Sequence, residues 1–333
     1  MKILFELSGE HPTLPLAEAM ACMKAEGIDF KEVKKGRIFI VDADVNDEEI
    51  NKIARRISLC HTINEVIALG TKEEIFTALS NYPIKQKFKI EGRKFKKEGS
   101  ISYLKKEFGE LLAKNAKVDL QNPDVIFRIF IEDSVFFCRK ISSIERKSFE
   151  QRKPQNRPFS SPISIHPKFA RAIVNLSQLK KGETLLDPFC GTGGILIEAG
   201  LIGAKVIGID VKKKIIEGCK KNLDYYGIKN YELYAMDMRE ACIEKVDCIV
   251  SDFPYGRSTY TGGELHFLYD KAFEKMKEWV KEGGKAVIGL PSKEFIDIGK
   301  KYFKLKEVHP LRVHKSLTRY FCVYLETKGL PSI

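Results

Sequence analysis

The stretch LLDPFCGTGGILIEAG, residues 185–200, decides the fold of the C-terminal half of this 333-residue chain. It has the pattern of an apolar strand ending in an acid, a glycine-rich turn and an amphipathic helix. In an open α/β sheet, ligands bind beside the carboxyl ends of the strands, so a cofactor is expected at this turn. Gly191, Gly193 and Gly194 let the backbone bend and approach a ligand closely. An ordinary tight turn is the alternative interpretation.

Strand and helix patterns alternate from residue 184 onward, which is typical of a doubly wound, mainly parallel sheet. Two further apolar runs, 306–313 and 320–326, are joined by a short polar connection with no helix. They predict an antiparallel hairpin at the edge of the sheet. The predicted strands before this hairpin are 184–187, 205–210, 231–236, 247–251 and 285–290, and the predicted helices are 194–203, 212–226, 264–282 and 293–302.

The N-terminal half, residues 1–141, mixes short β-branched or aromatic runs with helical patterns and predicts an α+β fold. Residues 1–84 contain ten basic and fourteen acidic side chains, whereas residues 85–106 contain nine basic and two acidic ones. A local basic patch is therefore expected in the second range. Predicted strands include 2–7, 38–41 and 125–132, and predicted helices include 15–26, 47–56, 72–81 and 102–116.

The stretch RKISSIERKSFEQRKPQNRPFSSP, residues 139–162, is polar and interrupted by prolines, as linkers are. Its excess of basic residues fits a path for nucleic acid and fits a solvated charged tether equally well. The boundary between the two halves of the chain is expected here.

Composition sets broad limits on the function. Apolar residues make up 44% of the chain and charged residues 31%, so a globular protein with real cores is expected. The net charge of +12 slightly favours a polyanionic partner. No signal-peptide pattern and no membrane-length apolar run occur, which predicts a soluble, cytoplasmic protein. The eight cysteines include no C-x-x-C pair, which argues against a zinc ribbon; buried thiols and one or two disulfides both remain open.

Two acids at strand ends indicate an adenosine-containing cofactor. Asp210 is well placed to accept from two ribose hydroxyls, and Asp187 suits the ammonium of a methionine moiety better than a pyrophosphate. The NAD fingerprint G-x-G-x-x-G requires glycine at a position that Leu196 occupies. S-adenosyl-L-methionine (SAM) is therefore the predicted cofactor, with Asp237 a candidate for the adenine amino group or, equally, a helix cap.

The hexapeptide SDFPYG, residues 251–256, follows the fourth strand and predicts the reaction. An exocyclic amine on a base is a poor nucleophile, because its lone pair is delocalised into the ring. The Asp252 carboxylate and the Phe253 carbonyl would each accept one N–H and localise that lone pair. Pro254 restricts the backbone, and Tyr255 offers a face for stacking the base. Transfer to a base amine needs no metal, and RSTYTGG, residues 257–263, would form a lid.

These motifs resemble a known family. DPFCGTGG and D-x-P-Y-G resemble the amino-methyltransferase motifs, and PISIHPKFARAIVNL, residues 162–176, resembles the helix before them in tRNA guanine-N2 methyltransferases. KVDLQNPDVIFRIFIEDSVFFCRK, residues 117–140, resembles the end of an RNA-gripping THUMP domain, and VHKSLTRYF, residues 313–321, is also similar. The family is that of the archaeal THUMP-domain tRNA (guanine-10-N2) methyltransferases, which form N2-methyl- and N2,N2-dimethylguanosine. One departure is Phe253, where the family usually has proline. The carbonyl that would accept from the base amine is kept, but the sequence predicts a less rigid backbone and one additional N–H at this position.

The resemblance implies an N-terminal ferredoxin-like subdomain (1–58), a THUMP domain (59–141), a linker (142–161) and a Rossmann-like SAM methyltransferase domain (162–333). A monomer that binds tRNA and no membrane is expected. The predicted catalytic residues are Asp252, Phe253, Pro254 and Tyr255. The predicted cofactor-binding residues are His166, Asp187, Cys190, Gly191, Thr192, Gly193, Gly194, Asp210, Asp237, Met238 and Asp252. The predicted RNA-binding residues are Lys94, Lys96, Lys97, Arg128, Arg139, Arg257, Lys315 and Arg319.

Two other functions remain as alternatives. A DNA adenine-N6 or cytosine-N4 methyltransferase would share the chemistry of the reaction site, although the N-terminal half argues for RNA. A non-catalytic RNA-binding protein with a degenerate Rossmann-like domain is less consistent with the three acids Asp187, Asp210 and Asp252. Calorimetric titration with SAM would separate such a non-catalytic protein from a methyltransferase.

Overall fold

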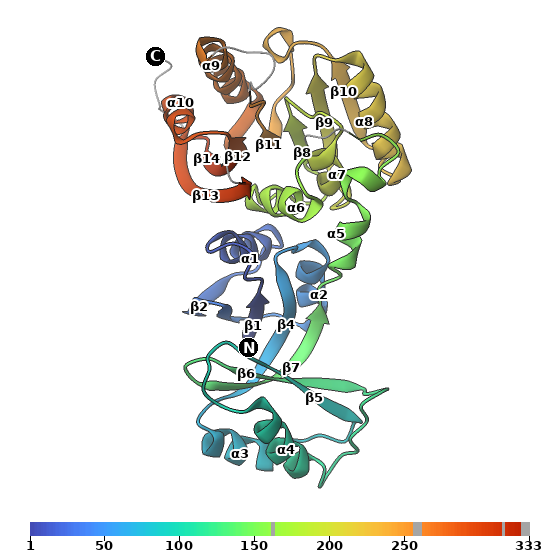
Figure 1. Ribbon diagram of the computed structural model, residues 1–333, viewed down its shortest axis with the longest axis vertical. Helices are drawn as coiled ribbons and strands as arrows, with labels where there is room; N and C mark the ends of the chain where they lie inside the picture. The colour runs from blue at the N-terminus through green and yellow to red at the C-terminus, as the bar shows by residue number, and fades with distance from the viewer. Residues whose placement is uncertain (161–163, 256–261, 315–316, 328–333) are drawn as a thin grey trace. The chain divides into compact units, whose positions relative to one another are not determined.

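The computed structural model describes residues 1–160, 164–255, 262–314 and 317–327. Within them the chain forms two seven-stranded sheets with their helices (Figure 1). The strands are β1 Lys2–Leu7, β2 Phe30–Lys34, β3 Ile38–Ala43, β4 Cys60–Gly70, β5 Phe88–Lys94, β6 Val125–Ile131, β7 Val135–Ser143, β8 Thr184–Asp187, β9 Lys205–Asp210, β10 Tyr231–Ala235, β11 Val246–Asp252, β12 Val280–Leu290, β13 Lys304–His314 and β14 Leu317–Leu325. The helices are α1 Leu14–Ala25, α2 Asp47–Arg56, α3 Lys72–Ser80, α4 Ile101–Leu112, α5 Lys147–Gln151, α6 Pro167–Leu176, α7 Gly194–Gly200, α8 Lys213–Tyr225, α9 Gly262–Trp279 and α10 Ile296–Tyr302, with 3-10 turns η1 Pro154–Asn156, η2 Met238–Glu240 and η3 Lys293–Phe295.

The second sheet has the strand order β10-β9-β8-β11-β12-β14-β13. The first five strands are parallel, and β14 pairs antiparallel with both β12 and β13. The predicted antiparallel hairpin at the sheet edge is therefore confirmed. The order reverses between β8 and β11, because the chain builds β9 and β10 on one side of β8 and then crosses to the other side.

Helices cover both faces of this sheet, as expected for a parallel sheet whose strands are apolar on both sides (Figure 1). On one face α6, α7 and α8 pack against strand residues such as Leu185 and Val250. On the other face α9 and α10 pack against their neighbours Leu186 and Ile249. The C-terminal half is thus a three-layer α/β domain with a Rossmann-like arrangement, and its fold class is the predicted one.

The first sheet has the order β2-β3-β1-β4-β7-β6-β5, and only the β5–β6 pair is parallel. Its strands come from both the 1–58 and the 59–141 ranges, so these ranges share one sheet. Helix α3 buries Ile75 and helix α4 buries Phe108 against the β5–β6–β7 side of it. The strands β2, β4, β5 and β7 were not identified from the sequence. Register shifts interrupt the pairing of β2 and of β4, so apolar and polar residues do not alternate regularly there.

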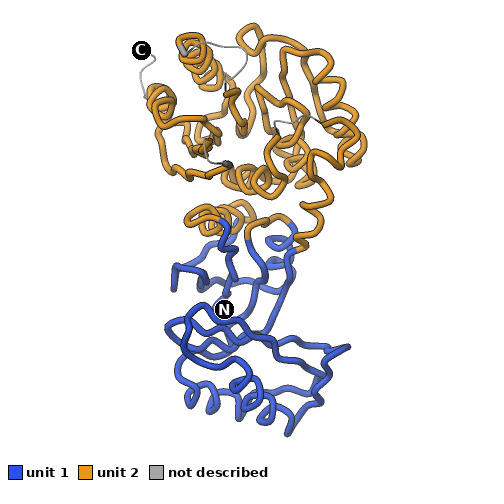
Figure 2. The backbone as a smooth tube through the Cα atoms, in the orientation of Figure 1, with its two compact units in different colours: residues 1–10, 27–55, 60–144 blue, residues 11–26, 56–59, 145–333 orange. Residues whose placement is uncertain are grey.

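The chain divides into two compact units (Figure 2). Unit 1 contains residues 1–10, 27–55 and 60–144, and unit 2 contains residues 11–26, 56–59 and 145–333. Helix α1 therefore belongs with the C-terminal part, where it packs on α6 through Leu14 and Ala21. The four ranges expected from the sequence remain a proposal beside this division.

The segment expected to be a linker is largely folded. Residues 145–160 belong to unit 2 and include α5 and η1. Phe149 and Arg157 are buried, and Arg152 pairs with the buried Glu198 of α7. A solvated tether is thus the wrong description of this part, because Phe149 is buried and Arg152 forms an ion pair within unit 2.

Candidate active site

Three carboxylates lie at the ends of three adjacent parallel strands. Asp210 ends β9, Asp187 ends β8 and Asp252 ends β11. Asp187 pairs with Gly208, and Leu186 pairs with Ile249, so Asp187 lies two positions below both of its neighbours. At about 3.3 Å per residue this makes a step roughly 7 Å deep in the sheet edge. The step coincides with the reversal of strand order, which is where open α/β sheets bind ligands.

Asp187 lies at the bottom of this step and is almost fully buried. Its Oδ1 accepts hydrogen bonds from the Ser251 hydroxyl at 2.6 Å and the Phe189 N–H at 3.1 Å. Burial, with a smaller contribution from the nearby charges of Asp252 and Asp210, raises the pKa of Asp187 to about 7. No lysine or arginine among the described residues forms an ion pair with Asp187. A cationic ligand would supply the missing counter-charge.

The glycine-rich turn after β8 has the backbone that its sequence predicts. Gly191 and Gly193 have φ values of 50° and 83°, in the left-handed region that favours glycine. A Cβ on Gly191 would meet nothing within 4 Å, whereas a Cβ on Gly193 would lie 2.7 Å from the Cys219 sulfur. The turn is therefore closely packed behind Gly193 and open at Gly191, as a cradle for a ligand requires.

Side chains from α8 hold this turn in place. The Asn222 amide donates to the Thr192 carbonyl at 2.9 Å, and Asn222 itself is fully buried. Cys190 is buried between the turn and β9, and its N–H donates to the Ile209 carbonyl at 2.9 Å. Both Cys190 and Thr192 thus support the turn through their backbone and packing, while contact of their atoms with a cofactor remains a prediction.

Asp210 has the environment of a ribose acceptor. One carboxylate oxygen accepts from the Lys212 N–H at 2.9 Å, and no ion pair to Asp210 occurs among the described residues. Partial burial raises its pKa. Asp237 differs, because it caps η2 and also binds the Arg239 guanidinium, with contacts of 2.5 to 3.1 Å. The structure thus shows the capping role for Asp237, and Met238 beside it is buried in the core.

The reaction-site peptide is rigid although it lacks the usual first proline. The Phe253 N–H, which a proline would lack, donates to the Gly289 carbonyl of β12 at 3.0 Å. The Phe253 ring is fully buried and packs against Phe189, Tyr269 and Phe273 at centroid distances of 4.9 to 5.5 Å. The sheet and the aromatic core therefore restrain the Phe253 carbonyl where the sequence left its geometry in doubt.

Asp252 is engaged by two side chains. The Tyr255 hydroxyl donates to its Oδ1 at 2.5 Å, and Arg319 Nη2 lies 3.1 Å from its Oδ2. Arg319 Nε also donates to the Tyr255 hydroxyl, and the guanidinium lies over the tyrosine ring at 5.1 Å. Burial raises the pKa of Asp252, while Arg319 and the Tyr255 hydroxyl lower it. Arg319 was predicted to bind RNA; instead it is buried in the reaction site.

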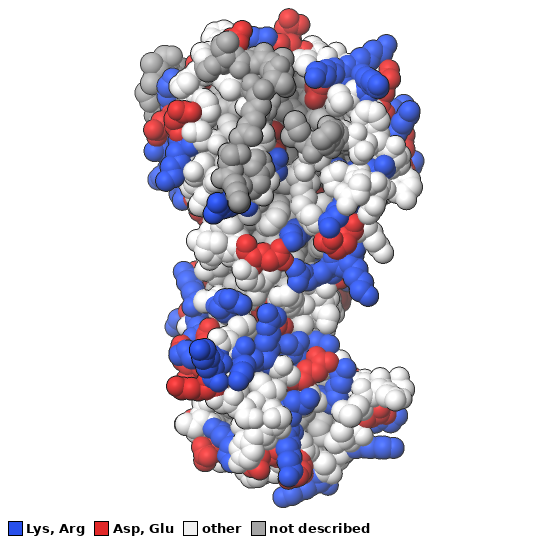
Figure 3. Space-filling model, in the orientation of Figure 1, with Lys and Arg blue, Asp and Glu red and all other residues white. Residues whose placement is uncertain are grey.

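The other predicted RNA contacts fall into three groups. Arg128 is buried beside Glu6, at 3.1 Å, and Arg139 is held by Asp47 and Glu65, so neither is a free surface cation. Lys94, Lys96 and Lys97 are exposed, as expected, with Lys96 paired to Asp133. Arg257 and Lys315 lie outside the described residues, as does most of the predicted lid. In the view of Figure 3, lysines and arginines are grouped on unit 1 with acidic side chains among them.

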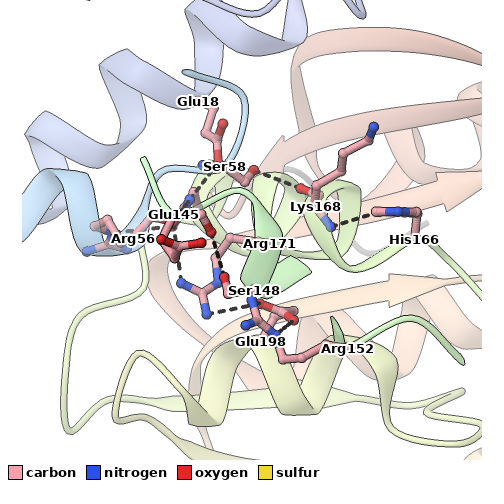
Figure 4. Close-up of polar contacts among 11 residues, drawn as sticks. Glu18, Arg56, Ser58, Glu145, Ser148, Arg152, His166, Lys168, Arg171 and Glu198 are labelled. Atoms are coloured by element: carbon pink, nitrogen blue, oxygen red, sulfur yellow. Dashed lines mark hydrogen bonds and ion pairs between the residues drawn. The ribbon is translucent and has the colours of Figure 1, made fainter. Parts of the chain in front are cut away.

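His166 caps α6, since its Nδ1 accepts from the Lys168 N–H at 3.3 Å. Its Nε2 lies 3.2 Å from Glu150, and burial lowers its pKa. Figure 4 shows it at one end of a network that joins α1, α6 and α7. A contact between His166 and a cofactor stays a prediction.

The network in Figure 4 fixes the helix that follows the glycine-rich turn. Glu198 of α7 is fully buried and is bound by Arg152 at 2.8 Å and Arg171 at 3.0 Å. Glu18 of α1 is also buried and accepts from the Ser58 hydroxyl, two backbone N–H groups and the Asn175 amide. The turn is thus followed by a helix that two buried ion pairs of Glu198 anchor.

Two further observations concern metals and membranes. Nowhere in the described part of the chain do three His, Cys, Asp or Glu side chains lie close enough to hold a metal ion. Among the same residues, no helix combines the length and apolar character needed to cross a membrane. All eight cysteines are described and are free thiols, with Cys242 exposed.

Comparisons with known proteins connect this geometry to a chemistry. Residues 154–320 match the family described as RMKL-like, methyltransferase domain, and residues 31–221 match a DNA methylase family. A tRNA (guanine(10)-N2)-dimethyltransferase of Methanothermobacter thermautotrophicus is 36% identical over 96% of this chain and 98% of its own length. An enzyme of the same name from Methanocaldococcus jannaschii is 32% identical, with the same coverage of both chains.

Solved structures share the fold over the whole chain. TrmN from Thermus thermophilus superposes with a TM-score of 0.56 and 19% identity, covering 98% of this chain and all of that one. SMU.472, crystallised with S-adenosylhomocysteine (SAH), superposes with a TM-score of 0.54 and 16% identity over 98% of both chains. At these identities the likeness establishes the fold.

Proposed function

The chain belongs to the family of tRNA (guanine(10)-N2)-dimethyltransferases, and from this premise we propose that it transfers methyl groups from SAM to N2 of guanosine 10 in tRNA. Because the relatives are named dimethyltransferases, two successive transfers to the same nitrogen are proposed. The observation that carries the proposal is the step in the sheet edge, where Asp187 and Asp210 flank the glycine-rich turn and Asp252 lies on the next strand.

The side chains at this edge fit the chemistry of SAM. Asp187 and Asp210 form no ion pair among the described residues, and the turn at Gly191 is open, so a cationic ligand with a ribose would find both acceptors available. Asp187 would accept from the ammonium and Asp210 from the ribose hydroxyls. When bound, SAM supplies an electrophilic methyl group on a sulfonium. His166, Cys190, Thr192, Gly193, Gly194, Asp237 and Met238 complete the proposed cofactor-binding set. Asp252, which the sequence placed in both sets, is proposed as a catalytic residue alone, because Arg319 and Tyr255 contact its two oxygens.

The chain's own residues prepare the guanine amine. Asp252 and the Phe253 carbonyl each accept one N–H, which localises the nitrogen lone pair, and the Tyr255 ring offers a stacking surface. As the N–C bond forms and the C–S bond breaks, the bonding pair stays on sulfur and the amine loses a proton. Asp252 accepts this proton or passes it to water. Positioning of donor and acceptor supplies much of the rate.

The RNA-binding part of the proposal rests on unit 1. The exposed Lys94, Lys96 and Lys97 would contact phosphates, and the predicted contacts Arg257 and Lys315 remain proposals. We place the enzyme in the cytoplasm, acting as a monomer. The proposed THUMP domain would lie within unit 1.

The decisive experiment uses unmodified tRNA transcripts, labelled SAM and nucleoside mapping. The wild type should form N2-methyl- and N2,N2-dimethylguanosine at position 10, and Asp252→Ala should lose at least about 10²-fold in rate. SAM affinity, measured by calorimetry, should stay within threefold. Full activity in the variant would refute the catalytic assignment. A parallel reaction with duplex DNA tests the alternative raised by the DNA methylase match, and preferential labelling of DNA would overturn the tRNA assignment.

A further inference from the structure

Arg319 enters the reaction site from a strand that runs against the other strands of the site. β14 begins near Leu317 and pairs antiparallel with β12, where Phe321 lies opposite Gly289. Gly289 in turn lies opposite Asp252 of β11. The amino end of β14 therefore meets the carboxyl end of β11 at the same sheet edge. Arg319, two positions before Phe321 and on the same side of β14, reaches Asp252 for this reason.

The contacts of Arg319 involve both side chains that the reaction uses. Its Nη2 lies 3.1 Å from Asp252 Oδ2, and its Nε donates to the Tyr255 hydroxyl, which donates to Asp252 Oδ1 at 2.5 Å. The side chains of Arg319 and Asp252 are 7% and 15% exposed. In such a site a charge pair interacts more strongly than in water, and either partner alone would carry the cost of its burial.

We propose that Arg319 is a positioning residue for methyl transfer, which holds Asp252 ionised at Oδ2 and leaves Oδ1 to be exchanged between the Tyr255 hydroxyl and the incoming amine. This inference deepens the proposed function and rests on it. Only the ionised carboxylate accepts from an amine at Oδ1 while it remains paired at Oδ2. In the structure Oδ1 is bound to Tyr255, so the amine must displace that hydroxyl, and the guanidinium over the ring keeps Tyr255 close for stacking.

The electrostatics around Asp252 support this role. The ionisable groups that face it are Arg319 on β14, Tyr255 on the same segment, Asp187 on β8 and Tyr269 on α9. Arg319 is the cation among these groups. Burial raises the pKa of Asp252 and Arg319 opposes that rise, so its loss should move the protonation of Asp252 to higher pH.

The test compares Arg319→Met and Arg319→Lys with the wild type. In Arg319→Met, kcat should fall about 10²-fold, with SAM affinity and tRNA affinity each within threefold. The acidic limb of the pH–rate profile should move to higher pH. Arg319→Lys should recover part of kcat and return the acidic limb toward that of the wild type, since a lysine can still pair with Oδ2. Lys304→Met, an exposed charge loss on β13, is the matched control and should change none of these values.

A readout independent of turnover separates this inference from the proposed function. Carboxyl-carbon NMR of labelled aspartate, with Asp252→Asn to assign the signal, should show Asp252 titrating at higher pH in Arg319→Met than in the wild type. Wild-type protein that transfers no methyl group to tRNA would refute the proposed function, whereas an unmoved Asp252 titration would refute the role of Arg319. Loss of tRNA affinity with kcat and titration unchanged would identify Arg319 as an RNA contact. If Arg319→Met does not fold, as judged by circular dichroism, Arg319→Gln takes its place, because it also removes the charge: an Asp252 titration moved to higher pH supports the role, and an unmoved titration overturns it.

Discussion

Two groups of buried carboxylates in unit 2 differ in their partners. Glu18 of α1 and Glu198 of α7 belong to the network of Figure 4. Glu18 accepts hydrogen bonds from Ser58 and Asn175, and Glu198 forms ion pairs with two arginines. Asp187, at the sheet edge, is as deeply buried but accepts only from Ser251 and Phe189 and has no cation among the described residues. Both environments have low exposure, but both oxygens of Glu18 and of Glu198 have partners, whereas the hydrogen bonds of Asp187 from the described residues reach Oδ1 alone.

The difference teaches how to separate structural charge from functional charge in this fold. A buried carboxylate whose partners are complete contributes to one unique packing, and removing one partner leaves the other buried and unpaired. A buried carboxylate that lacks a counter-charge is destabilising unless a ligand supplies one. Perturbed carboxylates in a cleft are therefore candidates for ligand binding. Asp252 is intermediate, since it has a cation but exchanges one partner in the proposed reaction.

The largest effect is expected for Glu198→Ala, which leaves Arg152 and Arg171 without their carboxylate. Removing one partner of a buried ion pair costs about 3–5 kcal/mol, so the free energy of unfolding of unit 2 should fall by this order in urea titrations. Glu198→Gln should lose less, because it keeps shape and one acceptor. Asp297→Asn, which breaks an exposed pair with Lys300, should give no measurable change. A Glu198→Ala protein as stable as the wild type would show that the two sites do not differ as argued.

Asp187→Asn sharpens the comparison at the unpaired site. SAM should bind this variant about 10- to 100-fold more weakly than the wild type, as expected for a lost hydrogen bond between charged groups. Because the pKa of Asp187 is about 7 and a cation favours the ionised form, wild-type affinity should rise with pH between 5.5 and 7, with protons released on binding. The experiment is calorimetry below pH 7.5, since the donor's own amino group titrates at about 7.7–8.0.

In Asp187→Asn this pH dependence should disappear. Asp247→Asn is the control, because Asp247 accepts from the Thr184 N–H at the other end of β8 and pairs with exposed Lys281. It should keep the wild-type dependence of donor affinity on pH. If SAM affinity still depends on pH in Asp187→Asn, a group other than Asp187 is titrating. The argument that Asp187 lacks a counter-charge would then be wrong.

The smallest effect per residue is expected for exposed charges. Reversing Lys94, Lys96 and Lys97 to Glu should weaken tRNA binding and flatten its salt dependence, by about 0.7–0.9 in the log–log slope for each lost phosphate contact. SAM affinity should not change. Reversal of Lys300 and Lys301 on α10 provides a comparison of exposed lysines in unit 2. Equal losses of tRNA and SAM binding would indicate misfolding. If tRNA binding does not weaken, these three lysines do not contact tRNA.

Local patterns predicted much of the fold and part of the site. The ends of β1 and α2 agree with the sequence-based expectations to the residue, because alternation and helical periodicity are strong there. The meeting of Asp187, Asp210 and Asp252 at one edge followed from parallel strands alone. Four strands of unit 1 were missed, since apolar and polar residues do not alternate regularly in strands with register shifts. The folded part of the segment 139–162 was missed because its composition is polar.

The ion-pair partners of three arginines could not be predicted from the sequence. Arg128, Arg139 and Arg319 were all predicted to contact RNA, because an arginine by itself gives no local sign of which carboxylate it pairs with. Their partners are Glu6, Asp47 with Glu65, and Asp252 with Tyr255. Each pairing joins segments that are distant in the sequence, so no pattern within a window could reveal it.

By itself the sequence determined the parallel α/β order, the glycine turn and the residue types at each strand end, because these depend on short-range periodicity and backbone freedom. Tertiary structure alone decided which charges have partners. It placed the antiparallel β14 beside β12, brought Arg319 to Asp252 and gave the Phe253 N–H an acceptor. It also left Asp187 without a cation partner within the part of the chain that the structure describes. The physical reason is that burial and charge compensation depend on contacts across the fold, which local spacing does not encode.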